Sequence, residues 1–245
     1  MTRYDESTYG DSIADEYDDL YGSARPAAID MLAELAGSGP ALELGIGTGR
    51  IGIPLAERGV DVHGIESSQA MVDKLKAQPG GERVTVTLGD FSHCAVPGSF
   101  RLVFVVTNTL YCLTTQDDQV ACFRNVAARL TPDGVFVVHA YVPNMTWWTN
   151  GQGVEIQDIS LDRVWLEASR HHAVSQTVDS QYVIIEDGSV RLHPVRIRYV
   201  WPAEMDLMAR LAGLRLRKRF GGWNGERFTA GSSVHVSVYE RDPDA

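Results

Sequence analysis

The stretch Ala41-Leu-Glu-Leu-Gly-Ile-Gly-Thr-Gly-Arg50 joins a short apolar segment to three glycines that alternate with other residues. Residues 51–58 follow with helical spacing, so we expect a strand, a glycine loop and a helix in that order. Glycine allows positive φ and lets a ligand approach the main chain closely. At the carboxyl edge of a parallel sheet, such a loop is a nucleotide-binding position. The stretch therefore predicts an α/β fold with a nucleotide-type site.

Strands and helices alternate around this loop. We expect strands at residues 41–44, 60–66, 83–88, 102–107 and 135–141, and helices at residues 24–35, 51–58, 68–77 and 116–130. The run at residues 102–107 is continuously apolar, which is typical of a parallel strand buried on both faces. Thr131-Pro-Asp-Gly134 is a turn signal that should end the helix before it. This alternation predicts a doubly wound parallel sheet.

The pattern changes near Trp147. Long β-rich segments, which we place at residues 163–177, 181–186 and 190–201, predict an antiparallel sheet inserted after the fifth parallel strand, with a tight turn at Glu186-Asp-Gly188. A helix at residues 202–212 and strands at residues 214–220 and 234–240 complete the chain. We therefore expect an N-terminal lid at residues 1–22, a main domain at residues 23–145 and 202–245, and an inserted antiparallel sheet at residues 146–201.

Composition narrows the class of protein. The chain has 245 residues, a net charge of −10 and 44% hydrophobic residues, which suits one large domain with a sizeable core. The acidic balance opposes binding to nucleic acid, and the longest uncharged apolar runs, such as residues 102–113, are too short to cross a bilayer. The polar N-terminus lacks the features of a secretory signal. Three cysteines, Cys94, Cys112 and Cys122, fit reduced thiols, so we expect a cytoplasmic protein.

Acidic residues follow two further strands. Glu66 ends the second strand, where its carboxylate can accept both hydroxyls of a ribose. Asp90 ends the third strand, where it can accept from an adenine amino group while Phe91 packs near the ring. Glu43 precedes the loop, and a carboxylate there opposes a phosphate but suits a cation. Together these positions predict a nucleoside site.

A dinucleotide fingerprint is the competing interpretation of the loop. Gly47, Gly49 and Gly52 satisfy the spacing of that motif, which would indicate NAD. Counting from Gly45, the first glycine after the strand, the third fingerprint position is instead Arg50. The register therefore disfavours an NAD-linked oxidoreductase.

Four motifs taken together resemble one family. Glu43-Leu-Gly-Ile-Gly-Thr-Gly49, His63-Gly-Ile-Glu-Ser-Ser-Gln-Ala-Met71, Leu88-Gly-Asp-Phe91 and Leu130-Thr-Pro-Asp-Gly134 are similar to class I S-adenosylmethionine-dependent methyltransferases. The resemblance covers residues 10–142 well and is nearest to actinobacterial natural-product N-methyltransferases, which act on amino sugars, lincosamide-like amines and peptide amino termini. It implies a seven-stranded sheet whose last strand is antiparallel.

The resemblance also implies a set of cofactor-binding residues. Gly45, Gly47 and Gly49 would lie beneath the methionine part of S-adenosylmethionine, Glu66 would hold the ribose, and Asp90 and Phe91 would frame adenine. Met71 would pack on the adenosine, or would instead be a core residue of its helix. The remaining members of the expected set are Ser67, Tyr17 and Asn108.

Methyl transfer needs alignment and a dry site more than covalent help. We expect Tyr9, Tyr17 and Asn108 to be catalytic, because a tyrosine hydroxyl can accept a hydrogen bond from an amine and Asn108 follows the fourth strand. The tyrosines could instead only anchor a helix, and Asn108 could only form a turn. Trp147 and Trp148 could wall the substrate site or pack the insertion onto the domain.

Two other charged or titratable groups leave alternatives open. Residues 1–22 carry seven acids against one base, Arg3, which indicates either a solvated face or a lid whose field favours a cationic substrate. His139 fits a core position, whereas one of His171 and His172 could face the site. The histidines and cysteines have no metal-ligand spacing, so no metal is expected.

The sequence therefore predicts an enzyme that transfers a methyl group from S-adenosylmethionine to an amine of a small molecule, in antibiotic or other natural-product biosynthesis. An O-methyltransferase acting on a hydroxyl or carboxylate is the near alternative, and a non-catalytic nucleoside-binding module is the distant one. We expect a small-molecule substrate, no nucleic-acid or membrane partner, and a homo-oligomer for which the inserted sheet offers a surface.

Overall fold

The computed structural model describes residues 4–93 and 96–245, so Arg3 and Cys94 lie outside the described residues. Its larger sheet has seven strands in the order β10-β11-β5-β4-β1-β2-β3. These strands are β1 (Ala41–Leu44), β2 (Val62–Glu66), β3 (Thr85–Leu88), β4 (Phe100–Val105), β5 (Leu130–Tyr141), β10 (Leu214–Phe220) and β11 (Val234–Arg241). Strands β1 to β5 pair in parallel, and β11 is antiparallel to both β5 and β10. The predicted doubly wound sheet with an antiparallel last strand is confirmed.

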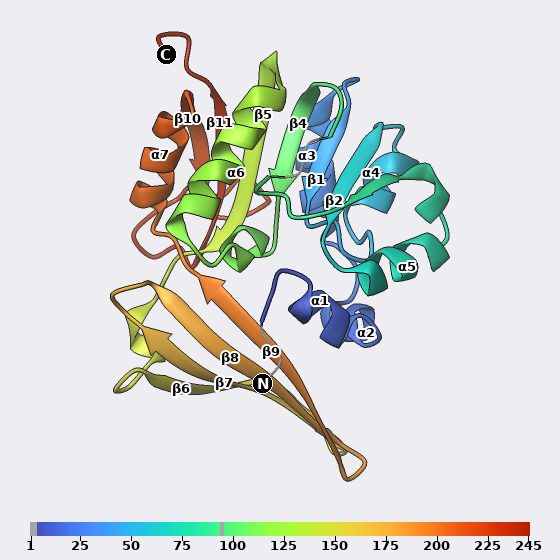
Figure 1. The fold of residues 1–245 in the computed structure, drawn as a ribbon, viewed down its shortest axis with the longest axis vertical. Helices are drawn as coiled ribbons and strands as arrows, with labels where there is room; N and C mark the ends of the chain where they lie inside the picture. Colours follow the sequence, from blue (N-terminus) through green and yellow to red (C-terminus); the bar gives the residue numbers. More distant parts are fainter. Residues whose placement is uncertain (1–3, 94–95) are drawn as a thin grey trace.

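Helices cover both faces of this sheet (Figure 1). They are α3 (Pro26–Ala36), α4 (Gly52–Glu57), α5 (Gln69–Ala77), α6 (Gln116–Arg129) and α7 (Pro202–Leu211), and the short 3-10 turns are Gly81–Arg83, Thr109–Cys112 and Met145–Trp147. Within β4, Leu102 and Phe104 belong to one hydrophobic core, and Val103 and Val105 belong to the other. The continuous apolar strand is therefore buried on both faces, as its sequence predicts.

The second sheet has four antiparallel strands between β5 and α7: β6 (Gln152–Ile159), β7 (Arg163–His172), β8 (Thr177–Glu186) and β9 (Ser189–Arg198). Asp187 and Gly188 both have positive φ, 48° and 75°, which fits the predicted tight hairpin turn. We expected three long segments, so β6 was missed. Most of its residues are exposed on both faces, and it therefore lacks the alternation that marks a half-buried strand.

Helix α6 ends at Arg129, just before the predicted turn signal, but the strand that follows begins earlier than predicted. Strand β5 begins at Leu130, so Thr131-Pro-Asp-Gly134 lies within the strand and not before it. Leu130 pairs with Phe100, and the register then shifts before Leu102 pairs with Val135. This irregularity accommodates the proline inside the strand.

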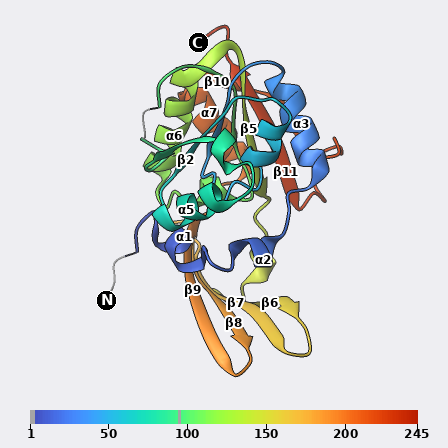
Figure 2. The same cartoon turned by 90° about the vertical axis from the view of Figure 1, so that its right-hand side faces the viewer.

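The N-terminal helices α1 (Thr8–Ile13) and α2 (Tyr17–Tyr21) lie between the two sheets, as Figures 1 and 2 both show. Their apolar side chains form a small separate cluster in which Ile13 and Ala14 pack on Met71 of α5. The N-terminal segment therefore covers the carboxyl edge of the large sheet, where the glycine loop lies.

In the part of the chain that the structure describes, no helix is long and apolar enough to cross a membrane.

Candidate active site

A pocket lies between the glycine loop and the N-terminal segment, and we call it the loop pocket. Its cavity volume is about 90 Å³. The expected cofactor residues that line it are Tyr17, Gly45, Gly47, Glu66, Ser67, Met71, Asp90 and Phe91, and the remaining lining comes from Tyr4, Asp5, Glu6, Tyr9, Gly10, Thr109, Cys112 and Leu113. The fold thus brings eight of the ten residues of the expected set to one place. Gly49 and Asn108 lie outside this lining.

The three loop glycines have different surroundings. All have positive φ, of 70° at Gly45, 58° at Gly47 and 86° at Gly49. A Cβ atom on Gly45 would collide with the methyl group of Thr109, and one on Gly49 would lie 2.7 Å from Ile53 Cδ1, whereas one on Gly47 would meet nothing within 4 Å. Gly45 and Gly49 are therefore required by packing, and Gly47 borders open space that a ligand can occupy.

Glu66 connects the end of β2 to the loop. The residue is 8% exposed, and its carboxylate accepts hydrogen bonds from the backbone N–H groups of Gly47 (2.9 Å), Ser67 (3.0 Å) and Ser68 (2.9 Å). Burial raises the pKa of Glu66 despite these bonds. An ionised carboxylate offers about four acceptor positions, and three are used, so Glu66 can still accept from one ligand hydroxyl.

Asp90, Phe91 and Met71 also line the loop pocket. Asp90 accepts from the backbone N–H (2.8 Å) and hydroxyl (2.7 Å) of Ser92, which fixes the turn after β3. Met71 is 3% exposed and packs on the N-terminal helices while it lines the pocket. Met71 is therefore a buried residue of its helix and also part of the pocket wall.

The N-terminal segment is fixed to the main domain largely by its acidic residues. These contacts join Asp11 to Ser68 (2.6 Å), Asp15 to Lys74 (2.8 Å), Asp18 to Thr48 (2.6 Å) and Gln78 (2.7 Å), and Glu16 to Arg191 of the inserted sheet (2.8 Å). In addition, the Arg50 Nε donates to the Gly22 carbonyl at 2.7 Å. The acids therefore act mainly as anchors, a role that neither of the two alternatives for this segment included.

A second cavity of about 350 Å³ lies between the N-terminal helices and the inserted sheet, and we call it the sheet cavity. Tyr9, Tyr17, Thr109 and Cys112 line both this cavity and the loop pocket. Its other aromatic lining residues are Tyr21, Tyr141, Trp147, Trp148 and Tyr182, and its polar residues from the inserted sheet are Glu155, Gln157, Glu167, Ser169 and Ser180. Tyr9 and Tyr17 therefore stand where the two spaces meet.

The hydroxyl groups of these two tyrosines are neutral at ordinary pH. The Tyr9 hydroxyl lies 2.9 Å from that of Tyr21, and burial raises the pKa of Tyr9 well above its usual value. Burial also raises the pKa of Tyr17 to about 12, while the Arg50 guanidinium lies 5.7 Å from the centre of the Tyr17 ring. The tyrosines can therefore donate or accept hydrogen bonds, but they are not bases.

Asn108 lines the sheet cavity within a strained turn. Thr107 and Asn108 have φ values of 54° and 67°, a region that non-glycine residues rarely adopt. The Asn108 side-chain oxygen accepts from the backbone N–H of Tyr141 (2.8 Å), and the Thr107 N–H donates to Nδ1 of His139 (3.1 Å). Asn108 is thus a turn-forming residue that also reaches the cavity, and its amide NH₂ remains as a donor.

The histidines have structural contacts. Burial lowers the pKa of His139 to about 4, so it stays neutral and can accept from Thr107. The His171 ring stacks on the Trp148 ring with 4.3 Å between ring centres, and its Nε2 lies 2.9 Å from the Tyr199 hydroxyl. The Nε2 of His172 lies 3.4 Å from a carboxylate oxygen of Asp179. Across residues 4–93 and 96–245, no group of three or more His, Cys, Asp or Glu side chains is arranged to hold a metal ion.

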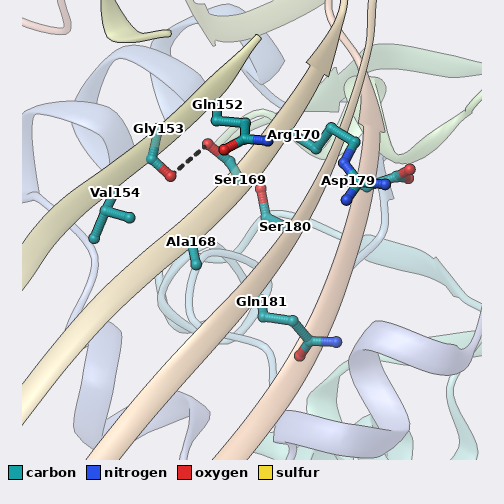
Figure 3. Close-up of a pocket in the computed structure, with 9 residues that line it drawn as sticks. All are labelled: Gln152, Gly153, Val154, Ala168, Ser169, Arg170, Asp179, Ser180 and Gln181. Carbon is teal, nitrogen blue, oxygen red and sulfur yellow. Dashed lines mark hydrogen bonds between the residues drawn. The ribbon is translucent and has the colours of Figure 1, made fainter. Parts of the chain in front are cut away.

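A further hollow of about 530 Å³ lies over β6, β7 and β8 (Figure 3). There the Ser169 hydroxyl donates to the Gly153 carbonyl at 3.4 Å. This hollow shares Gly153, Val154, Ser169 and Ser180 with the sheet cavity, but none of its lining residues borders the loop pocket. It is a surface feature of the inserted sheet, separate from the glycine loop.

Comparison with known proteins identifies the family. The chain is 43% identical to the CcbJ methyltransferase from Streptomyces caelestis, over 97% of this chain and 99% of that one, with a TM-score of 0.91 between the structures. A family model described as a methyltransferase domain matches residues 41–134. The chain belongs to the S-adenosylmethionine-dependent methyltransferases.

Other relatives of this methyltransferase are more distant. It is 26% identical to the cypemycin N-terminal methyltransferase of a Streptomyces species, over 97% of this chain and 99% of that protein. The sugar N-methyltransferase KedS8 from Streptoalloteichus shares the fold, with a TM-score of 0.68 at 18% identity over 98% of this chain and 99% of that one.

The residues of the loop pocket fit S-adenosylmethionine. Gly47 borders open space, and the buried Glu66 carboxylate retains one acceptor position for a ribose hydroxyl. The Glu43 carboxylate is 2% exposed, and its Oε2 has no hydrogen-bond partner among the described residues. Burial raises the pKa of Glu43 well above its usual value. The carboxyl groups that line the pocket, Glu66 and Asp90, suit a cofactor with positively charged groups and oppose the phosphates of a dinucleotide.

Proposed function

We propose that this methyltransferase transfers a methyl group from S-adenosylmethionine to an amine of a small molecule in natural-product biosynthesis. The observation that carries the proposal is the junction at Tyr9 and Tyr17, where the loop pocket meets a cavity large enough for a small acceptor. The names of the cypemycin N-terminal methyltransferase and the sugar N-methyltransferase KedS8 support nitrogen as the acceptor atom.

In this proposal the loop pocket holds the cofactor. Glu66 and Ser67 would bind the ribose, and Met71, Asp90 and Phe91 would surround the adenine, while Gly45 and Gly47 lie beneath the methionine part and Gly49 supports the loop through its packing. When bound, S-adenosylmethionine supplies a methyl group activated by a sulfonium. The chain's own contribution is to fix this pocket through the hydrogen bonds between Glu66 and the backbone.

Tyr9 and Tyr17 would orient the acceptor. A neutral amine can donate a hydrogen bond to a tyrosine hydroxyl while its lone pair points toward the methyl group, and both hydroxyls are neutral. Asn108 would contribute its amide NH₂ as a donor to the acceptor or to the cofactor. The aromatic lining would exclude water, which favours attack by the amine.

We further propose that the chain works as three parts. Residues 23–145 and 202–245 hold the cofactor, residues 146–201 form the outer wall of the sheet cavity, and residues 1–22 act as a lid. A loop pocket of about 90 Å³ is smaller than the roughly 300–1,000 Å³ of typical ligand sites. The lid residues that line this pocket would therefore shift when the cofactor binds.

A second copy of the chain is our proposed partner for the outer face of the inserted sheet. Ile156, Leu166, Val183 and Leu192 are consecutive cross-strand neighbours there, and Ile156 and Leu192 are 62% and 57% exposed. Burying such an apolar row favours association. Light scattering should detect a multiple of the 26.9 kDa chain mass, and Ile156→Lys with Leu192→Lys should give the monomer. A monomeric native protein would exclude this interface.

The function is tested by turnover with S-adenosylmethionine against matched panels of amines, phenols and carboxylic acids, with S-adenosylhomocysteine formation as the readout. Methylation of amines supports the proposal. Methylation of hydroxyl or carboxyl groups alone would establish the O-methyltransferase alternative. Tight binding of S-adenosylhomocysteine without turnover on any panel would favour a nucleoside-binding module.

A further inference from the structure

Two glutamates of the inserted sheet lie side by side in the sheet cavity. Glu155 of β6 and Glu167 of β7 are direct cross-strand partners, and both line the cavity. The next pair along these strands, Ile156 and Leu166, belongs to the outer apolar face because successive residues of a strand point to opposite sides. The register of the sheet therefore directs two carboxylates into the same space.

This arrangement is electrostatically unfavourable in the absence of a cation. Like charges directly opposite each other on antiparallel strands destabilise the sheet. Glu167 accepts from the Ser180 hydroxyl at 2.6 Å and from the Gln157 amide at 3.4 Å, and both of these donors are neutral. Burial, together with the charge of Glu155, raises the pKa of Glu167. Hydrogen bonds alone therefore leave the pair without a compensating charge.

The other acidic residues within the strands of the inserted sheet each have a compensating positive charge. In each case a carboxylate oxygen lies close to a guanidinium nitrogen. The pairs are Asp158 with Arg163 (2.6 Å), Glu186 with Arg191 (2.7 Å) and Asp179 with Arg196 (2.5 Å). Within the part of the chain that the structure describes, neither Glu155 nor Glu167 forms an ion pair. The two carboxylates that face the cavity thus differ from the other carboxylates within the strands, and the cavity is where a cation can reach them.

The neighbouring lining also suits a cation. Tyr182 of β8 is the cross-strand partner of Glu167, so an aromatic ring adjoins the carboxylate pair. Tyr141, Trp147 and Trp148 contribute further rings to the cavity. Aromatic faces attract ammonium groups, and this attraction strengthens as water is removed. Carboxylates and rings in one cavity are a combination that recognises a positively charged alkylamine.

We propose that the Glu155–Glu167 pair binds the positively charged amino group of the acceptor and makes this methyltransferase prefer cationic acceptors over neutral ones. The inference rests on the proposed function, because it concerns the acceptor of that reaction. It assigns recognition of the charge to the inserted sheet, whereas the acids of residues 1–22 mainly anchor the lid. The same carboxylates also raise the pKa of a bound amine, so tighter binding is gained at some loss of nucleophilicity. The ammonium must pass its proton to a carboxylate of the pair or to water before the neutral amine can attack the methyl group.

The test compares two probes of nearly equal shape on the full chain saturated with S-adenosylhomocysteine. N-methylbenzylamine is cationic at neutral pH, and benzyl methyl ether is its neutral counterpart. Calorimetry, or quenching of the fluorescence of the cavity tryptophans, measures the two dissociation constants. The native protein should bind the amine about tenfold more tightly or better, as expected for a charged hydrogen bond.

Variants identify the carboxylates responsible. Glu155→Gln with Glu167→Gln should abolish the preference, and each single change should reduce it by several-fold. Glu186→Gln is the matched control, because it removes one negative charge from the same sheet at a residue that does not line the cavity. Equal binding of both probes by the native protein, or an undiminished preference in the double variant, would overturn the proposal.

Two further measurements keep the test decisive. Glu155 is exposed, so Glu155→Gln should fold even if a change at Glu167 does not, and relief of the repulsion should leave its melting temperature unchanged or raised.

Turnover separates this inference from the proposed function. Methylation of amines with an unaltered charge preference in the double variant refutes only the inference. Binding of the cationic probe together with methylation of hydroxyl groups alone refutes only the proposed function.

Discussion

The loop pocket and the sheet cavity are built in different ways. In the loop pocket, backbone groups fix the key carboxylate: the N–H groups of Gly47, Ser67 and Ser68 all donate to Glu66. The sheet cavity is lined by side chains from the N-terminal helices, the turn after β4 and the inserted sheet. The first site therefore depends on main-chain conformation, and the second on side chains that can change without altering the fold.

This difference predicts how each region responds to mutation. Changes in the loop pocket should remove the cofactor and with it all activity, whatever the acceptor. Changes in the sheet cavity should alter the choice and orientation of the acceptor while cofactor binding persists. The following experiments test this division, beginning with the largest effect.

The largest effect is expected for Gly47→Val. The side chain would occupy the open space beside the loop, and the φ of 58° strains any L-residue. Affinity for S-adenosylhomocysteine should fall by about a hundredfold or more, as expected when several cofactor contacts are lost together. Gly59→Val is a matched control, because Gly59 also has positive φ and open surroundings but lies outside the loop pocket. If calorimetry gives normal affinity in a folded Gly47→Val protein, the loop does not hold the cofactor.

The next effect concerns Glu66. Glu66→Ala removes the acceptor of three backbone N–H groups as well as the proposed ribose contact. Cofactor binding should weaken by roughly 1.5–3 kcal/mol, the range for hydrogen bonds to a charged group. Glu57→Ala, at an exposed position outside the pocket, provides the control. An unchanged dissociation constant for S-adenosylmethionine would remove Glu66 from the site.

The loop pocket was easier to predict from sequence than the sheet cavity for a physical reason. Its residues follow strand ends in sequence order, so local patterns locate them. The pairing of Glu155 with Glu167 depends on the register between β6 and β7, and β6 itself lacks a clear alternating pattern. Only the outward position of Ile156 and Leu166 on the same two strands, read together with the register, indicates which residues face inward. Asn108 was placed near the reacting groups, but its bond to the Tyr141 N–H depends on the tertiary fold.

Tyr9 and Tyr17 line both the loop pocket and the sheet cavity, so variants at these positions test how the two regions work together. Phenylalanine at each position keeps the ring and removes the hydroxyl that would orient the amine. At least one of the variants should lower kcat by about tenfold or more, a loss of roughly 1.4 kcal/mol, while cofactor affinity changes much less. Tyr21→Phe adds a comparison, since the Tyr21 hydroxyl lies 2.9 Å from that of Tyr9. Full turnover in both Tyr9→Phe and Tyr17→Phe would mean that these tyrosines only anchor the lid.

The smallest effect concerns the stability of the ligand-free protein and compares a carboxyl group from each region. Burial raises the pKa of both Glu43 and Glu167. A carboxyl whose pKa is higher in the folded chain contributes stability that is present below the unfolded pKa of about 4.3 and is lost as pH rises through the folded value.

Glutamine does not ionise, so Glu43→Gln should melt at a higher temperature than the native protein at pH 8, by about 2–4 °C for each kcal/mol of relieved desolvation. The difference should shrink toward pH 4. Glu167→Gln should behave in the same way to a smaller extent, because Glu167 is partly exposed and accepts from Ser180, whereas Glu43 is 2% exposed. If the difference in melting temperature between each variant and the native protein is the same at pH 4 and at pH 8, neither carboxyl group is destabilised by burial of its charge. If the difference is larger for Glu167→Gln than for Glu43→Gln, the order expected from burial is wrong.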